Sequence, residues 1–426
     1  LFHSFERFGV ESSQIVTFTG PDSIRNVVAR VTGGAPTRID GALRSRVGEA
    51  DLYLVNPAGL TFGPGAFLDV PGSFHAGAAH ELRFADGARF SATNMAGSVL
   101  TAAAPAAFGF LDRPAGGVRV DESILLVGPG RSLSLVGGDV AVVGGPFGLL
   151  WAPGGTLTLA SAQSAGAVDL RTGAMTSPLG GEVRLSGDAV AVTTGEGGGA
   201  VRIRGRTLVV EGSTVAADTI GDVDATGGVH VAVDRMDLLG GSRIMTVADG
   251  GGDAGAVGIA AGSAEIRDGS KILSRAAAAG DAGPVTVRVG RLLVSGSGAG
   301  PDGQSGILSD TDPGSAGDAG PVTIEADSLD VSEGGLVSTA TFGDGNAGLL
   351  KIAAGAMRVD GGAIVSFATE ESKGRAGSIS LKVRGALEVG PGGLVDSSTL
   401  GQGAAGLVDI EAGRVTLRGE GDSKAQ

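Results

Sequence analysis

The sequence predicts an all-β protein whose short parallel strands stack as a β-helix. Three observations predict it: 79 of the 426 residues are Gly, short apolar–polar alternations recur every 27–29 residues from about residue 228, and no segment keeps a helical apolar spacing over three turns. Alternation with a period of two residues indicates strands. Because a few short strands cannot bury their own apolar face, such units must stack on one another.

Each repeat is marked by a Gly that precedes an alternating run: Gly228, Gly255, Gly283, Gly320, Gly348, Gly377 and Gly406. The apolar residues two positions after the last six of these glycines are expected to form one inward stack: Val257, Val285, Val322, Leu350, Ile379 and Val408. We expect three strands of three to five residues per repeat, the third marked by Ile244, Ile272, Leu336, Ile364 and Leu394. A single insertion at about 296–305 is expected to protrude as a loop.

Aromatic residues divide the chain into two regions. Eleven of the 14 Phe lie before residue 111, and only Phe147, Phe342 and Phe367 follow. This shift predicts a boundary between about 110 and 150. The Gly-rich remainder must fill a narrow core with Val, Leu, Ile and Ala.

Charge and composition exclude several classes of function. The net charge of −14 argues against nucleic acid and against an anionic membrane surface, both of which need an excess of Lys and Arg. The absence of Cys removes disulfides, thiolate nucleophiles and Cys-based metal sites. No apolar run reaches the ~20 residues of a membrane helix. Because position 1 is Leu, we expect the sequence to begin inside a longer product.

Acidic residues and Asn recur just before the repeat Gly, at Asp253, Asp281, Asp318 and Asn346. Stacked coils would align them as a ladder. Such a row of oxygen ligands could bind Ca²⁺, or the side chains could bond the backbone of their own turns. The tandem nonapeptide of calcium-binding β-rolls is absent, which favours turns and predicts no metal site.

Catalysis is not predicted either. Hydroxyls recur at Ser274, Ser309, Ser338, Ser366 and Ser397, but no His follows residue 230 to serve as a base. A β-helical lyase or hydrolase of acidic polysaccharides would need Asp clustered with Arg or Lys in a lateral groove. The Arg residues here are spaced regularly, which favours solvated faces: Arg267, Arg288, Arg291, Arg358 and Arg384. The sequence therefore predicts no enzyme, no catalytic residue and no cofactor.

The N-terminal region carries the most specific pattern. Its segments, in order, are LFHSFERF at 1–8, NVVARVTGG at 26–34, IDG at 39–41, LYLVNPAGL at 52–60, FGP at 62–64 and GSF at 72–74. This order resembles the secretion domain of filamentous-haemagglutinin-like proteins, the exported partners of two-partner secretion systems. The resemblance covers residues 1 to about 110.

One segment within this region matches a hallmark of that family. Asn56-Pro57-Ala58-Gly59-Leu60 resembles Asn-Pro-Asn-Gly-Ile, with Ala58 and Leu60 as departures. Pro57 fixes φ and Gly59 permits a left-handed turn, so a rigid turn is expected after the strand at 52–55. The turn could nucleate the β-helix, or the transporter could recognise it directly.

The resemblance also implies the remaining expectations. Asn26, Gly33 and Gly34 join the secretion motif. Residues 1–150 form the secretion domain and 151–426 a β-helical repeat shaft, both right-handed parallel β-helix. The partner is an outer-membrane β-barrel transporter with periplasmic POTRA modules. The protein passes through the periplasm to become a secreted or surface-exposed adhesin, with a glycan or protein of a host or neighbouring cell as a further partner. A structural surface or matrix protein remains an alternative to the adhesin and the lyase.

Overall fold

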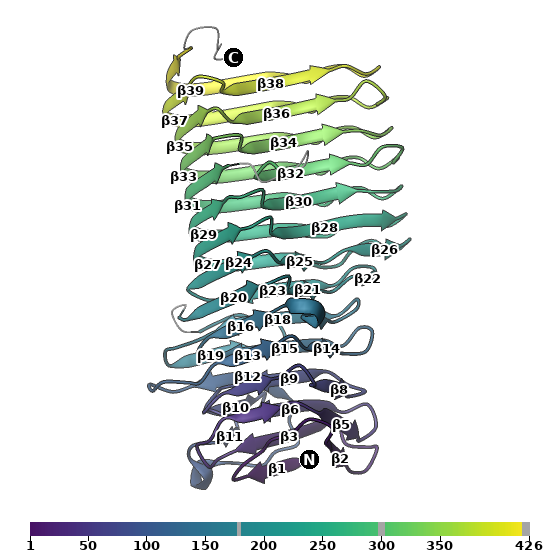
Figure 1. The fold of residues 1–426 in the computed structure, drawn as a ribbon, viewed down its shortest axis with the longest axis vertical. Helices are drawn as coiled ribbons and strands as arrows, with labels where there is room; N and C mark the ends of the chain where they lie inside the picture. Colours follow the sequence, from purple (N-terminus) through teal and green to yellow (C-terminus); the bar gives the residue numbers. More distant parts are fainter. Residues whose placement is uncertain (177–179, 297–302, 420–426) are drawn as a thin grey trace. The chain divides into compact units, whose positions relative to one another are not determined.

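The computed structural model describes residues 1–176, 180–296 and 303–419. The chain divides into two compact units: unit 1 comprises Leu1–Thr193 with Val201–Val209, and unit 2 comprises Thr194–Ala200 with Val210–Gln426. In both units the strands that form the coils pair in parallel with their equivalents in neighbouring coils, which confirms the predicted β-helix (Figure 1). The described helices are two single 3₁₀ turns, Met95–Gly97 and Gly145–Phe147. Neither has the length or apolarity to cross a membrane.

In unit 2 each regular coil contributes one long strand and one shorter strand. The long strands are β27 (Gly228–Leu239), β29 (Ala256–Ile266), β31 (Val285–Ser295), β33 (Val322–Ser332), β35 (Leu350–Asp360), β37 (Ile379–Val389) and β39 (Val408–Leu417). The shorter strands are β28 (Arg243–Gly250), β30 (Lys271–Ala276), β32 (Gly306–Thr311), β34 (Leu336–Thr341), β36 (Ala363–Ala368) and β38 (Leu394–Thr399). The unit also contains β22 (Gly195–Glu196), β25 (Thr214–Ala216) and β26 (Thr219–Gly221). Figure 1 shows the long and the short strands as two parallel stacks.

The predicted inward stack is confirmed residue by residue. Val257 pairs with Val285, and the register continues through Val322, Leu350, Ile379 and Val408. The first five side chains are fully buried, whereas Val408 in the last strand is 36% exposed. Among the described residues of unit 2 the buried core is formed by these aliphatic side chains and contains no aromatic ring.

Two details of the predicted repeat are wrong. The first two strands of each repeat form one continuous strand, because a small residue such as Gly290 turns the corner without ending the strand. A Cβ at Gly290 would lie 2.6 Å from the carbonyl oxygen of Gly262 in the preceding coil. The third column is occupied by Val337 and Val395, not by Leu336 and Leu394. A shift of one residue moves a side chain to the other face of a strand.

Residues 297–302 of the insertion predicted at 296–305 lie outside the described residues, so its protrusion stays a prediction.

Unit 1 has shorter and less regular strands. One stack contains β1 (Phe2–Phe5), β3 (Asn26–Val31), β4 (Thr37–Ile39), β6 (Asp51–Val55), β7 (Leu60–Phe62), β9 (Phe74–Gly77), β13 (Val118–Asp121), β15 (Ser132–Gly137), β16 (Val140–Val143), β18 (Thr156–Ser161), β20 (Glu182–Ser186), β23 (Ala200–Arg204) and β24 (Thr207–Glu211). Other faces are formed by β2 (Ile15–Thr19), β5 (Ala42–Arg46) and β8 (Phe67–Asp69), and by β14 (Ile124–Leu126), β17 (Leu149–Trp151) and β21 (Val190–Val192).

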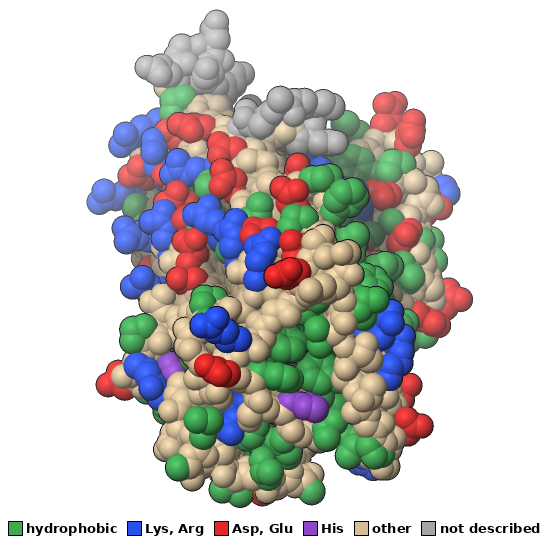
Figure 2. Space-filling view, turned by 60° about the horizontal axis from the view of Figure 1, so that its bottom comes forward, with side chains coloured by type: hydrophobic (Ala, Val, Ile, Leu, Met, Phe, Trp, Pro, Cys, Tyr) green, Lys and Arg blue, Asp and Glu red, His purple; other side chains and the backbone are tan. Residues whose placement is uncertain are grey.

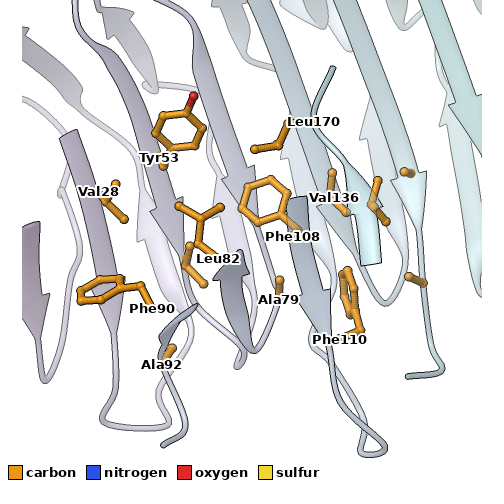
Figure 3. Packing of buried hydrophobic residues seen from close by; sticks show 14 of the residues in the cluster. Val28, Tyr53, Ala79, Leu82, Phe90, Ala92, Phe108, Phe110, Val136 and Leu170 are labelled. Atoms are coloured by element: carbon orange, nitrogen blue, oxygen red, sulfur yellow. The ribbon is translucent and has the colours of Figure 1, made fainter. Parts of the chain in front are cut away.

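A four-stranded antiparallel sheet also belongs to unit 1, and the sequence did not predict it. Its strands are β10 (Glu81–Phe84), β11 (Arg89–Ser91), β12 (Pro105–Phe110) and β19 (Gly166–Asp169), in the order β11–β10–β12–β19. The sheet covers a cluster of buried hydrophobic side chains on the outer side of the coils (Figure 3). The cluster includes Phe84, Phe90, Phe108 and Phe110. A Cβ at Gly77 would lie 2.5 Å from the Phe108 ring, so the ring packs directly on the coil backbone. This cluster accounts for four of the eleven early Phe, and Phe2 packs against it.

Candidate functional site

Asn56 is the centre of the predicted secretion motif, and it is buried. It directly follows β6 and is 1% exposed. Its side-chain nitrogen donates to the carbonyl oxygen of Ala35 at 3.0 Å and to the Thr37 hydroxyl at 2.9 Å. Its side-chain oxygen accepts from the backbone N–H of Ala58 at 3.0 Å. The amide therefore closes its own turn and ties that turn to the loop before β4.

The rest of the turn is fixed by the backbone. Gly59 has a φ of +116° and donates its N–H to the carbonyl oxygen of Asn56 at 3.0 Å. Gly116, in a later coil, donates to the carbonyl oxygen of Pro57 at 2.8 Å. A Cβ at Gly116 would lie 2.5 Å from the carbonyl carbon of Ala58, so the coils stack here with backbone in contact. Leu60 is buried, whereas Pro57 and Ala58 are half-buried and present the accessible part of the motif.

Gly33 and Gly34 lie beside this turn. Gly33 donates its N–H to the carbonyl oxygen of Glu6 at 2.9 Å, and a Cβ there would lie 2.2 Å from that same oxygen. Gly34 has a φ of +75°. Both glycines lead into Ala35, which accepts the bond from Asn56, so the structure brings these three motif residues into one group.

Asn26 lies apart from this group, at the start of β3. Its carbonyl oxygen accepts from the backbone nitrogen of Leu1 at 2.7 Å, and it pairs in register with Asp51. Asn26 therefore contributes to the pairing of β3 with its neighbouring strands rather than to the turn. Sequence reasoning missed the partners of the motif, Thr37 and the Gly116–Gly117 pair. Gly117, directly before the strand at 118, was the available signal, since a Gly also marks the start of each later repeat.

The site is structural in its chemistry. The residues from Asn56 to Leu60 carry no ionisable side chain, and their polar groups bond one another or the neighbouring coils. A cavity of about 410 Å³ lies next to the loop that Asn56 holds, and Phe8, Pro36, Arg38 and Asp40 line it. The arrangement can fix a chain conformation and can offer a shallow surface to another protein.

Comparison with known proteins identifies the family. The TPS secretion domain matches residues 1–225. This chain belongs to the TPS secretion domain family. Membership means export across the outer membrane by two-partner secretion, through an outer-membrane transporter, to the cell surface or the medium. The resemblance found in the N-terminal motifs is thereby confirmed.

The structural comparison gives a similar protein of known structure. The crystal structure of the HMW1 secretion domain from Haemophilus influenzae aligns with 95% of this chain and 92% of its own, at 17% sequence identity and a TM-score of 0.48. No curated protein matches the chain.

Beneath the antiparallel sheet of the TPS domain lies a buried polar column. Tyr53 stacks on His75 with ring centroids 4.7 Å apart, and Nδ1 of His75 lies 2.9 Å from the Ser134 hydroxyl. Burial lowers the pKa of His75 to about 4, against a smaller opposing effect of the Asp51 carboxylate. Burial, together with Asp51, also raises the pKa of Tyr53 well above its usual value. Both rings are therefore neutral at physiological pH.

The ladder of acidic residues in unit 2 bonds the backbone, though not in the predicted way. Asp253 accepts from the N–H of Asp281 at 2.8 Å, Asp281 from that of Asp318 at 2.7 Å, and Asp318 from that of Asn346 at 2.7 Å. Each oxygen thus bonds the next coil rather than its own turn. Within the described ranges no group of three His, Asp or Glu side chains is placed to hold a metal ion.

The predicted column of hydroxyl-bearing side chains is present, with Thr339 in place of Ser338. Ser274 lies in register with Ser309, whose hydroxyl has no hydrogen-bond partner in the described structure, and the next position in this column is Thr339, not Ser338. Thr339 donates to the hydroxyl of Ser366 at 3.0 Å. Ser338 points to the opposite side of β34, because it is one residue out of this register.

The outer face of the long strands in unit 2 carries charges of both signs, which Figure 2 shows interspersed on its left side. Its grooves measure about 620 and 680 Å³. The charges pair between coils: Arg288 with Glu325 at 3.3 Å, Lys382 with Glu411 at 3.4 Å and Arg384 with Asp327 at 3.5 Å. Pairing of this kind is typical of a solvated face, as the regular spacing predicted.

Proposed function

We propose that a POTRA-containing outer-membrane barrel recognises the N-terminal region of this exoprotein, and that the exported chain acts outside the cell as an adhesin. Recognition is assigned to residues 1–150, with its core in 1–110, and display to 151–426. The family match, which covers residues 1–225, supports the location of the export signal. A repeat shaft presents one surface many times, so it is poorly suited to marking one end of the chain.

The burial of Asn56 carries the proposal for the motif. A transporter that met the folded coil could not contact an amide that is 1% exposed. The amide therefore acts on the chain before or while this coil forms, by fixing the turn or by being read in the extended segment. Pro57 and Ala58 are the motif residues that a folded domain could present.

Two substitutions test whether the Asn56 amide is needed for secretion. Asn56→Ala removes all three side-chain bonds, whereas Asn56→Asp keeps the oxygen that accepts from Ala58 and loses both donors. We expect each to reduce the amount of protein outside cells that express the matching transporter. We also expect each to lower the free energy of unfolding by about 1–3 kcal/mol, because buried acceptors lose their donors.

Asn346→Ala is the matched control, since it removes a side-chain acceptor of a backbone N–H in unit 2. Its secretion should equal that of the wild type. A truncated protein without residues 1–110 should not be secreted. Normal secretion of both this truncation and Asn56→Ala would refute the proposal.

The adhesin role rests on the exposed lateral faces of unit 2, which offer a long surface with charges of both signs to a glycan or protein of another cell. The lyase and matrix-protein alternatives predict different behaviour. A lyase would shorten an acidic polysaccharide in solution, and a matrix protein would bind no cell. Binding of purified protein to intact cells, without loss of polysaccharide length, supports the adhesin.

A further inference from the structure

Unit 2 contains two aromatic residues, and they lie together. Phe342 and Phe367 pack edge to face with ring centroids 5.5 Å apart, and both line one cavity of about 370 Å³. After Trp151 the sequence has no other Phe, Tyr or Trp. The narrow core of these coils does not use aromatic rings, so a pair placed at one hollow on the outside indicates a contact surface.

The hollow forms because short side chains lie in the middle of the outer face of β34. Ser338 lies in register beside Leu308 of the preceding coil, and Ala340 lies between Asp310 and Phe367 of the adjacent coils. The longer side chains of Leu308, Asp310 and Phe367 on the adjacent strands form the walls of the cavity. The size falls within the range of about 300–1,000 Å³ that ligand sites occupy.

The rim is polar but carries no net charge. Nε of Arg275 lies 3.0 Å from Oδ1 of Asp310 and 3.3 Å from Oδ1 of Asp312, and Lys271 completes the rim. Two cations and two carboxylates thus face one opening. Burial raises the pKa of Asp310, and the nearby Arg275 opposes this effect. The rim supplies hydrogen-bond donors and acceptors side by side.

Two lining residues, Ser309 and Ser338, have unsatisfied hydroxyls, and Ser338 belongs to the outer face of β34. Ser338 is 3% exposed, and its hydroxyl has no hydrogen-bond partner in the described structure. An unsatisfied buried hydroxyl costs about 1–3 kcal/mol. Rotation about its Cα–Cβ bond can turn this hydroxyl toward the cavity, where a polar ligand would relieve that cost.

We propose that this cavity binds a neutral pyranose ring of a glycan. One face of such a ring consists of C–H groups that pack on Phe342 and Phe367, while its hydroxyls both donate and accept, as the Arg275–Asp312 rim requires. A charged ligand would leave one sign of the rim without a partner, and a purely apolar ligand would bury the rim unsatisfied. The proposal assigns a ligand class to the proposed adhesin. Its biological purpose rests on the adhesin role, whereas the binding itself does not.

The test uses the purified, folded full chain and four probes: the methyl glycosides of glucose, galactose, mannose and N-acetylglucosamine. Saturation-transfer NMR should show binding of at least one of them. Phe367→Leu, which keeps an apolar side chain but removes the ring, should weaken that binding about tenfold. Ser338→Ala should also weaken it, while leaving the melting temperature unchanged or higher, because it removes an unsatisfied hydroxyl.

Phe147→Leu is the matched control, since Phe147 is a 60% exposed aromatic residue of unit 1. It should bind the same glycoside as the wild type. Absence of saturation transfer to all four glycosides in the folded wild type would overturn the proposal. Binding by Phe367→Leu and Ser338→Ala that is as strong as binding by the wild type would also overturn it. The experiment needs no transporter, so its failure and a failure of the export proposal are distinguishable.

Discussion

Unit 1 and unit 2 are built from the same parallel coils, yet they treat the outside of those coils differently. In unit 1 an antiparallel sheet covers part of the outer face of the coils, and Phe side chains pack between the sheet and the coils. Unit 2 leaves its faces to solvent and joins its coils by repeated side-chain ladders and ion pairs. The difference shows two ways to stabilise a solenoid: one long-range packing cluster, or many small contacts between adjacent coils.

The largest expected effect tests the packing cluster. Phe108→Ala removes a fully buried ring between β12 and the coil backbone, so unfolding of unit 1 should become easier by about 3–5 kcal/mol. Hydrogen exchange of the amides in β10 and β12 measures this loss directly. Phe342→Ala, a half-buried ring in unit 2, should cost clearly less. Equal costs for the two substitutions would contradict the comparison.

A pH-dependent effect tests the polar column under the same sheet. The pKa of His75 is about 4 in the folded protein, below the value near 6.5 of an exposed His. The unfolded chain therefore binds a proton that the folded chain does not, and stability falls as the pH drops from about 6.5 to 4. The contribution of His75 over this range is about 3 kcal/mol.

His75→Gln should flatten this part of the pH dependence, measured as the free energy of unfolding between pH 7 and pH 4. His230→Gln is the control, because His230 is half-buried in unit 2. A slope that is the same in His75→Gln and in the wild type would show that the column does not resist protonation.

The smallest effect tests one rung of the ladder in unit 2. Asp281→Ala removes an exposed acceptor from the N–H of Asp318 and should cost about 1 kcal/mol. Asp281→Asn keeps an acceptor and lowers the repulsion along the ladder, so it should be close to the wild type in thermal unfolding. A melting temperature that rises on addition of Ca²⁺ would instead favour the ladder as a cation site.

The regular coils could be predicted closely because their signal is local. Period-two alternation after each repeat Gly was sufficient to place Val257 and its five partners in one stack. The third column failed by one residue at Leu336, since loop length decides which neighbour turns inward and apolar character alone does not. The antiparallel sheet was missed because strands such as β12 and β19 pair across more than fifty residues, and only the gathering of Phe hinted at an additional core.

The candidate site was predicted in part for a similar reason. The turn at Asn56 could be read from Pro57 and Gly59, which act locally. Its connection to Ala35 and Thr37 could not, because no spacing rule joins a buried amide to a loop about twenty residues earlier. The sequence also left open the burial of Asn56, and that burial separates early action on the chain from contact with the folded surface.

The partners of Asn56 give the turn a direction in time. All three of its side-chain bonds lie between residues 35 and 58, whereas the backbone contact with Gly116 comes from a coil about sixty residues later. A chain that emerges from its N-terminus can therefore lock this turn as soon as residue 58 is free. The formed turn then presents the carbonyl oxygen of Pro57, to which the later coil binds through Gly116. The coils would therefore assemble in the order in which the chain emerges.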